Sequence, residues 1–107
     1  MLSPGRYLFT SVVMIWGLSS VPAEAEVIQV TIDQLVFSPM EIEAKVGDTI
    51  EWTNKDIIAH TATVRDEWDV IIPANKSASI VLRKAGAVEY YCRFHPNMKG
   101  RIIVNPK

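Results

Sequence analysis

The chain has 107 residues, a formal net charge of −1 and a single cysteine, Cys92. A charge this close to zero, without a basic stripe, argues against nucleic-acid binding, and one cysteine excludes an internal disulfide. Acidic side chains gather at 66–69 and basic ones at 93–101, and we expect both groups to be solvated loop charges.

The first 25 residues have the pattern of a secretory signal peptide. Arg6 provides a positive start, an apolar stretch runs from Leu8 to Leu18, and residues 23–25 form a small-x-small cleavage site, Ala-Glu-Ala. The apolar stretch is short for a membrane anchor, and no other stretch is long and apolar enough to cross a bilayer. We therefore predict a signal peptide over residues 1–25 and one small exported domain over residues 26–107.

Short stretches of alternating apolar residues, broken by turn residues, follow one another through this domain, and no helical period persists. In chain order we expect strands near residues 27–32 (continued by 35–37), 40–45, 50–52, 61–64, 77–82, 88–92 and 100–104, with an ordered loop over 65–75. This spacing predicts an all-β fold, a two-sheet antiparallel sandwich with Greek-key connections as the expected topology.

Both histidines, the only cysteine and one methionine form a single pattern: His60, then Cys92, His95 and Met98. Two imidazoles, a thiolate and a weakly bound thioether are the donor set of copper sites that transfer one electron. Steps of three residues allow a tight turn to aim Cys92, His95 and Met98 at one point, while His60 begins another strand. Metal binding also explains an unpaired cysteine in an exported protein.

Each of these residues has an ordinary explanation when taken alone. A buried Cys or Met often only packs, and a lone histidine can be a hydrogen-bonded strand or turn residue. Together they favour one copper ion as the cofactor. Zinc is the main competitor, but methionine is not among its usual ligands, and an iron–sulfur cluster needs more thiolates.

Residues 40–104 resemble the cupredoxins, the blue copper family, and the Cys-x2-His-x2-Met spacing is most similar to the amicyanin branch. Shorter matches support the resemblance: Val46-Gly47-Asp48, Glu51-Trp52-Thr53-Asn54, Tyr90-Tyr91-Cys92 and His95-Pro96. The resemblance implies a type 1 copper site with His60, Cys92 and His95 as equatorial ligands and Met98 as the axial ligand.

Three residues, Thr61, Phe94 and Asn97, depart from the pattern of these relatives. Thr61 stands where the family often has an Asn that ties the His strand to the Cys loop. We expect the hydroxyl and backbone of Thr61 to replace that tie only in part.

The resemblance and the signal peptide together imply a monomeric periplasmic blue copper protein that carries single electrons between transient redox partners. We expect an apolar patch around His95, made by Ala59, Phe94 and Pro96; Ile57 and Ile58 either join this patch or pack in the core. The main alternative is a periplasmic copper(I) carrier or chaperone that uses the same ligands. We do not expect an enzyme, because metal catalysis needs an open coordination position or a second metal.

Overall fold

The computed structural model describes residues 24–107, which form β-strands joined by turns. Residues 1–23, most of the predicted signal peptide, lie outside the described residues. The strands are β1 (Val27–Asp33), β2 (Val36–Ser38), β3 (Glu41–Lys45), β4 (Thr49–Asn54), β5 (His60–Val64), β6 (Trp68–Ile72), β7 (Ser77–Val81), β8 (Gly86–Cys92) and β9 (His95–Asn105). Within residues 24–107, no helix has the length and apolar character needed to span a membrane.

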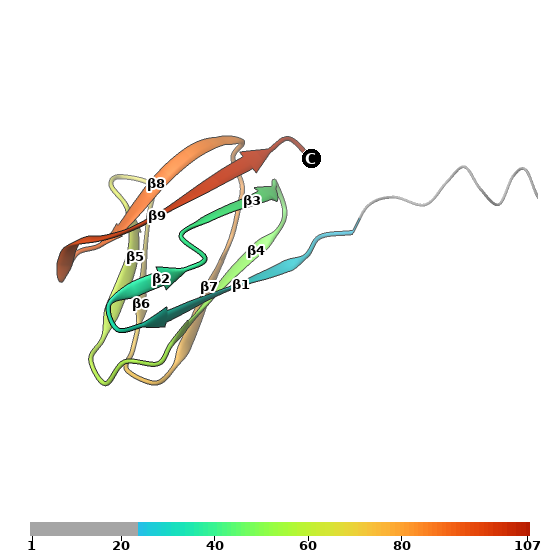
Figure 1. Cartoon of the computed structure of the whole chain (residues 1–107). Helices are drawn as coiled ribbons and strands as arrows, with labels where there is room; N and C mark the ends of the chain where they lie inside the picture. The colour runs from blue at the N-terminus through green and yellow to red at the C-terminus, as the bar shows by residue number, and fades with distance from the viewer. Residues whose placement is uncertain (1–23) are drawn as a thin grey trace, which may run out of the picture.

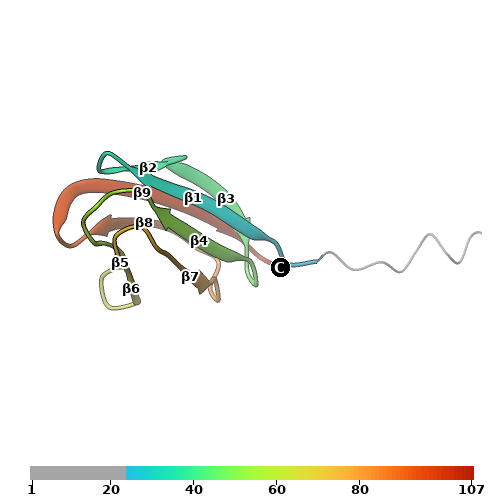
Figure 2. The same ribbon diagram turned by 90° about the horizontal axis from the view of Figure 1, so that it is seen from below.

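The strands form two sheets that enclose one apolar core, as shown in two views in Figures 1 and 2. One sheet has the order β2-β1-β4-β7 and the other has the order β3-β9-β8-β5-β6. The predicted all-β, two-sheet sandwich is confirmed. In both views the β8–β9 hairpin lies at the end of the sandwich opposite the C-terminus and the start of β1.

The sheets are mixed, which corrects the expectation of purely antiparallel pairing. β1 pairs in parallel with β4, and β3 pairs in parallel with β9. The chain crosses to the other sheet in β3 before it returns as β4, so β4 can run in the same direction as β1. Alternation of apolar residues reports which face of a strand is buried and carries no information on strand direction.

Three strands also differ from the prediction. Residues 35–37 do not continue the first strand: the chain turns after β1, and β2 pairs antiparallel with it. β6 lies within the segment expected to be a loop, because acidic residues around Trp68 hide the inward alternation of Trp68, Val70 and Ile72. β9 begins at His95 rather than at Gly100. The connection between β8 and β9 is therefore only a two-residue turn, which confines the residues that flank it.

A cluster of aromatic side chains anchors the strand that ends at Cys92. The Nε1–H of buried Trp52 donates to the hydroxyl of Tyr90 at 3.2 Å, and Phe37 packs against the Tyr90 ring at a centroid distance of 4.7 Å. Burial raises the pKa of Tyr90 to about 12, which keeps the hydroxyl neutral. The ring lies over Gly100 on β9, where a Cβ would overlap it. β8 and β9 are thus locked together just below the hairpin turn.

A buried carboxylate holds the opposite end of the sandwich. Asp48, in the turn between β3 and β4, accepts hydrogen bonds from the backbone N–H groups of Glu26 and Lys45, both at 2.9 Å. The ammonium of Lys45 lies 3.2 Å from the same side chain. The Glu26 bond, followed by those from Lys45, outweighs the opposite effect of burial and lowers the pKa of Asp48. The start of β1 is thereby fixed to this turn.

We predict that this contribution to stability disappears in acid. Because the pKa of Asp48 is lowered by folding, the stabilisation is present above the ordinary value of 3.8 and is lost as the pH falls through the folded value. By urea unfolding at pH 7, Asp48→Asn should reduce the free energy of unfolding by about 1.5–3 kcal/mol, the usual contribution of hydrogen bonds to a charged group.

This difference between Asp48→Asn and the parent protein should shrink as the pH approaches 3. Asp33→Asn, which removes an exposed carboxylate at the end of β1, serves as the control and should leave stability nearly unchanged. A difference for Asp48→Asn that stays constant from pH 7 to 3 would contradict this account.

Candidate metal centre

The structure brings three of the predicted ligands together at the hairpin end of the sandwich. His60 is the first residue of β5, Cys92 is the last of β8 and His95 is the first of β9. Their donor atoms all lie within 4.8 Å of one another. The pairing of Thr63 with Tyr91 aligns β5 with β8, and an irregularity between Tyr91 and Cys92 turns the end of β8.

The spacing of these atoms fits a single metal ion between them. The sulfur of Cys92 lies 3.7 Å from Nδ1 of His60 and 3.7 Å from Nδ1 of His95. A metal with one thiolate and one imidazole ligand at tetrahedral to trigonal angles holds sulfur and nitrogen about 3.5–3.8 Å apart. The donors present therefore fit a metal without a change in the fold.

Asp56 fixes which nitrogen of His60 faces the sulfur. His60 is fully buried, and its Nε2 lies 2.8 Å from Oδ2 of Asp56. A carboxylate can only accept, so Nε2 carries a proton, and in the neutral ring the lone pair of Nδ1 then points toward Cys92. This carboxylate–histidine arrangement is common behind metal ligands, where it fixes the tautomer and the ring orientation.

The same carboxylate supports the turn between β1 and β2. It accepts the backbone N–H groups of Gln34 at 2.7 Å and Leu35 at 3.0 Å, and both residues have positive φ, 53° and 64°. Burial alone would raise the pKa of Asp56, but the bonds from Leu35, His60 and Gln34 outweigh it and lower the pKa. Asp56 is therefore an ionised acceptor for three donors.

Thr61 ties the His strand to the Cys loop through two contacts. Its backbone N–H donates to the buried sulfur of Cys92 at 3.3 Å, and its hydroxyl accepts the backbone N–H of Arg93 at 2.9 Å. We expected Thr61 to supply only part of the tie that an Asn makes in this position. The structure shows a contact to each of two consecutive loop residues, so the departure at Thr61 does not leave the loop free.

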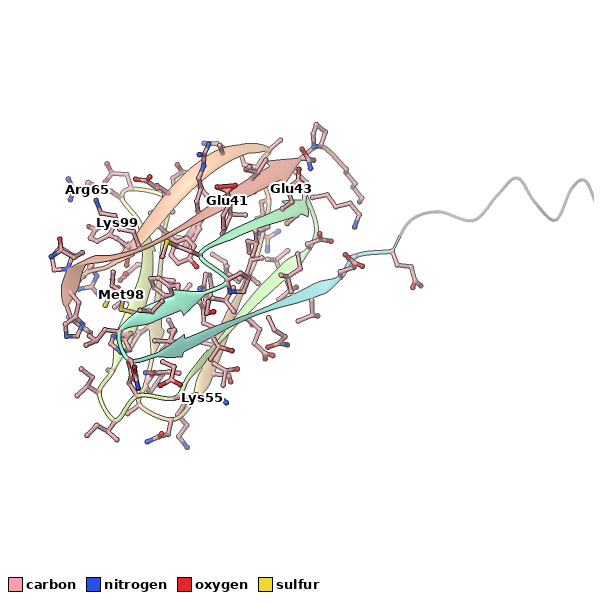
Figure 3. All side chains as sticks on the ribbon, viewed as in Figure 1. Glu41, Glu43, Lys55, Arg65, Met98 and Lys99 are labelled. Carbon is pink, nitrogen blue, oxygen red and sulfur yellow. The ribbon has the colours of Figure 1, made fainter. Side chains whose placement is uncertain are left out.

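Met98 lies within β9 rather than in a loop, and it is 4% exposed. It shares the inner face of this strand with Gly100 and Ile102, because alternate residues of β9 are buried. Figure 3 shows Met98 at the hairpin end of the sandwich. The thioether is thus an inward-facing group at the end that holds the other three predicted ligands.

Exposed apolar side chains lie beside the predicted ligands in the chain. His95 is partly exposed, unlike His60, and the neighbouring chain presents Ile57, Ile58 and Phe94 with exposed fractions of 86%, 44% and 50%. The alternative that Ile57 and Ile58 pack in the core is therefore wrong. We call Ile57, Ile58 and Phe94 the apolar rim.

Comparison with known proteins identifies the family. The chain matches the cupredoxin-like domain over residues 7–104. This protein belongs to the cupredoxin-like family. The predicted resemblance is thus confirmed, with amicyanins among the relatives of this cupredoxin. Amicyanin of Paracoccus versutus is 28% identical over 93 residues, which cover 80% of this chain and 69% of that protein. Amicyanin of Paracoccus denitrificans is 33% identical over 84 residues, which cover 72% and 64%.

Solved structures agree with this assignment. The crystal structure of amicyanin from Paracoccus versutus has a TM-score of 0.65 at 28% identity and covers 81% of this chain and 87% of that chain. A reduced Cu(I) form of an amicyanin variant, solved at pH 4, has the same TM-score and identity and covers 81% and 88%. The solved structures therefore support the same fold family as the sequence relatives.

Sequence reasoning missed two supporting residues. Asp56 precedes His60 by four positions in a loop, and a carboxylate so close to a candidate ligand was a usable signal. Asp69 was grouped with solvated acidic residues, yet it forms a bidentate pair with Arg93 from the basic group, at 2.9 and 3.0 Å. A pairing across 24 positions leaves no local signal in the sequence.

We predict that Asp56→Ala weakens metal binding by about 10- to 100-fold, the usual effect of removing a carboxylate behind a metal-binding histidine. The variant removes the acceptor that fixes the tautomer of His60 and the acceptor that holds the turn at 34–35. Competition with a chelator of known affinity measures the change. Asp33→Ala removes an exposed carboxylate at the end of β1 and should bind metal as the parent does. Equal affinities for all three proteins would contradict the role assigned to Asp56.

Proposed function

We propose that this cupredoxin carries single electrons through one type 1 copper ion held by His60, Cys92, His95 and Met98. The observation that supports this most directly is the pair of 3.7 Å distances from the Cys92 sulfur to an inward-facing nitrogen of each histidine. Copper bound to such a donor set supplies a one-electron couple. Four donors leave no open coordination position, so we propose a carrier rather than an enzyme.

The supporting contacts suit a site that changes oxidation state without moving its ligands. His60 is held by Asp56, and the sulfur of Cys92 is held by the backbone of Thr61. His60 and Cys92 are both inaccessible to solvent, so water is kept from the thiolate side of the site. These contacts hold the donor atoms in place. The donors therefore need little rearrangement when copper binds or changes its oxidation state.

The apolar rim is the surface that we propose for docking redox partners. Its residues are exposed and flank two of the proposed ligands in the chain, and His95 is the most exposed of the four donors. Small apolar contacts suit transient redox complexes, which must dissociate quickly. The polar face of β3, with Glu41 and Glu43 exposed, lies away from the hairpin end of the sandwich (Figure 3).

The decisive experiment is a visible and EPR spectrum of the copper-loaded domain, combined with voltammetry. We expect an intense visible band from charge transfer between Cys92 and copper(II), and a reversible one-electron wave. Cys92→Ser should lose the band. A colourless oxidised protein that gives up its copper readily and shows no reversible wave would instead indicate the copper(I) carrier.

Met98 is tested in the same experiment. Met98→Leu should keep the visible band and raise the reduction potential, because loss of the axial donor destabilises copper(II) more than copper(I). An unchanged or lower potential would remove Met98 from the ligand set.

We further propose that the protein is exported to the periplasm and processed after Ala25. The N-terminal sequence pattern supports this, and so does the position of Glu26, whose backbone N–H donates to Asp48 at 2.9 Å. Cleavage there would leave an α-ammonium group at the same atom. The existing hydrogen bond would then become an ion pair with a buried carboxylate, which is a stronger contact.

Mass spectrometry of the protein recovered from the periplasm of a bacterial host tests this processing. We expect a chain that begins at Glu26. Ala25→Leu, which places a large residue at the cleavage site, should accumulate as the uncleaved chain. A parent protein that retains Met1 would contradict the proposed processing.

A further inference from the structure

Two threonines on the outer face of β5 are buried, although they point away from the core. Thr61 and Thr63 alternate with His60 and Ala62, so their side chains lie on the opposite face of the strand. Nevertheless Thr61 is 0% and Thr63 is 5% exposed. Two buried hydroxyl groups outside an apolar core need partners, and the structure supplies them.

Four residues form a closed ring of hydrogen bonds over this face, which we call the Thr–Asp–Arg ring: Thr61, Thr63, Asp69 and Arg93. The backbone N–H of Arg93 donates to Oγ1 of Thr61, which lies 2.9 Å from Oγ1 of Thr63. Thr63 donates to Oδ1 of Asp69 at 2.5 Å. The guanidinium of Arg93 donates to both carboxylate oxygens and so returns to the residue where the ring began.

The carboxylate sets the direction of the two hydroxyl bonds in the ring. Asp69 can only accept, because the hydrogen bonds from Arg93 and then Thr63 lower its pKa and keep it ionised. The single hydroxyl proton of Thr63 therefore goes to Asp69. The proton of Thr61 must then go to Thr63, which leaves the lone pairs of Thr61 for the N–H of Arg93. Bonds aligned in this way reinforce one another.

We propose that Thr63 and Asp69 are positioning residues for the thiolate of Cys92, acting through the Thr–Asp–Arg ring. This inference rests on the proposed copper site. Thr61 is held by its hydroxyl on two sides, and its β-branched side chain has few rotamers. Its backbone N–H is thereby kept on the sulfur at 3.3 Å. At the same time Arg93, which follows Cys92, is held by both its backbone and its side chain.

The proposal predicts a direction for the reduction potential. A hydrogen bond to the sulfur withdraws electron density from the thiolate and weakens its donation to copper(II) more than to copper(I). An N–H held firmly on the sulfur therefore raises the potential. Loosening the ring should lower it.

A matched pair of variants at Thr63 tests the ring. Thr63→Val keeps the shape of the side chain and removes the hydroxyl, whereas Thr63→Ser keeps the hydroxyl. We expect Thr63→Val to strengthen copper(II) binding relative to copper(I) by about three- to tenfold, a decrease of about 30–60 mV for a one-electron couple. Thr63→Ser should match the parent. The proposal is overturned if both variants shift equally or if neither shifts.

A second pair of variants, Asp69→Asn and Asp66→Asn, removes one negative charge each from the segment around β6. This pair tests the proposal even if Thr63→Val does not fold. In Asp69→Asn, an amide NH2 group replaces Oδ2 and cannot accept from Nη2 of Arg93, so the bidentate pair is broken and the guanidinium side of the ring is loosened. Asp66→Asn removes an equal charge at a residue with a φ of 67°, which Asn tolerates. We expect a lower potential for Asp69→Asn only. An equal shift in both variants would assign the effect to charge alone and would overturn the proposal.

The ring is also tested without copper, which separates its failure from failure of the proposed function. In metal-free protein, Thr63→Val should speed hydrogen exchange of the amides of Thr61 and Arg93 by at least about threefold, as expected for the loss of one hydrogen bond. Thr63→Ser should leave these rates unchanged. Unchanged rates in Thr63→Val would refute the ring, while a colourless copper-loaded parent would refute only the copper site.

Discussion

The position of β5 beside β8 is the constraint on which the metal centre depends. His60 and Cys92 are separated by 32 positions in the chain, and only this pairing brings the imidazole to 3.7 Å from the sulfur. The short turn after Cys92 then returns His95 to the same sulfur. The aromatic cluster around Tyr90 and the contacts of Thr61 hold these strands in register, so much of the surrounding packing serves one arrangement of donor atoms.

Three aspartates act as cross-links in a domain that has no disulfide. Asp48 joins the start of β1 to the β3–β4 turn, Asp56 joins the β1–β2 turn to His60, and Asp69 joins β6 to the loop after Cys92. In each case the carboxylate accepts at least two donors from separate segments, and its pKa is lowered. Ionised carboxylates thus fasten both ends of a small sandwich whose core alone gives modest stability.

Residue pattern alone could predict the sandwich and the grouping of donors, because both depend on side-chain type and spacing. His60, Cys92 and His95 are chemically conspicuous, and the alternation of apolar residues marks most strands. Strand direction was beyond reach, since the parallel pairing of β1 with β4 depends on a chain path that alternation does not encode. β6 was missed because acidic residues interrupt its apolar pattern, and the same charges concealed the role of Asp69.

The place of β9 in its sheet has a consequence for how the protein is made. This last strand lies between β3 and β8, so β3 has no neighbour in its own sheet until the end of the domain has been synthesised. Long-range parallel pairing of this kind is a slow step in folding. The strand that completes the sheet also contains His95 and Met98, so a half-folded chain has no complete set of donors to trap a metal ion. The four donors are therefore together only once β9 has joined the sheet.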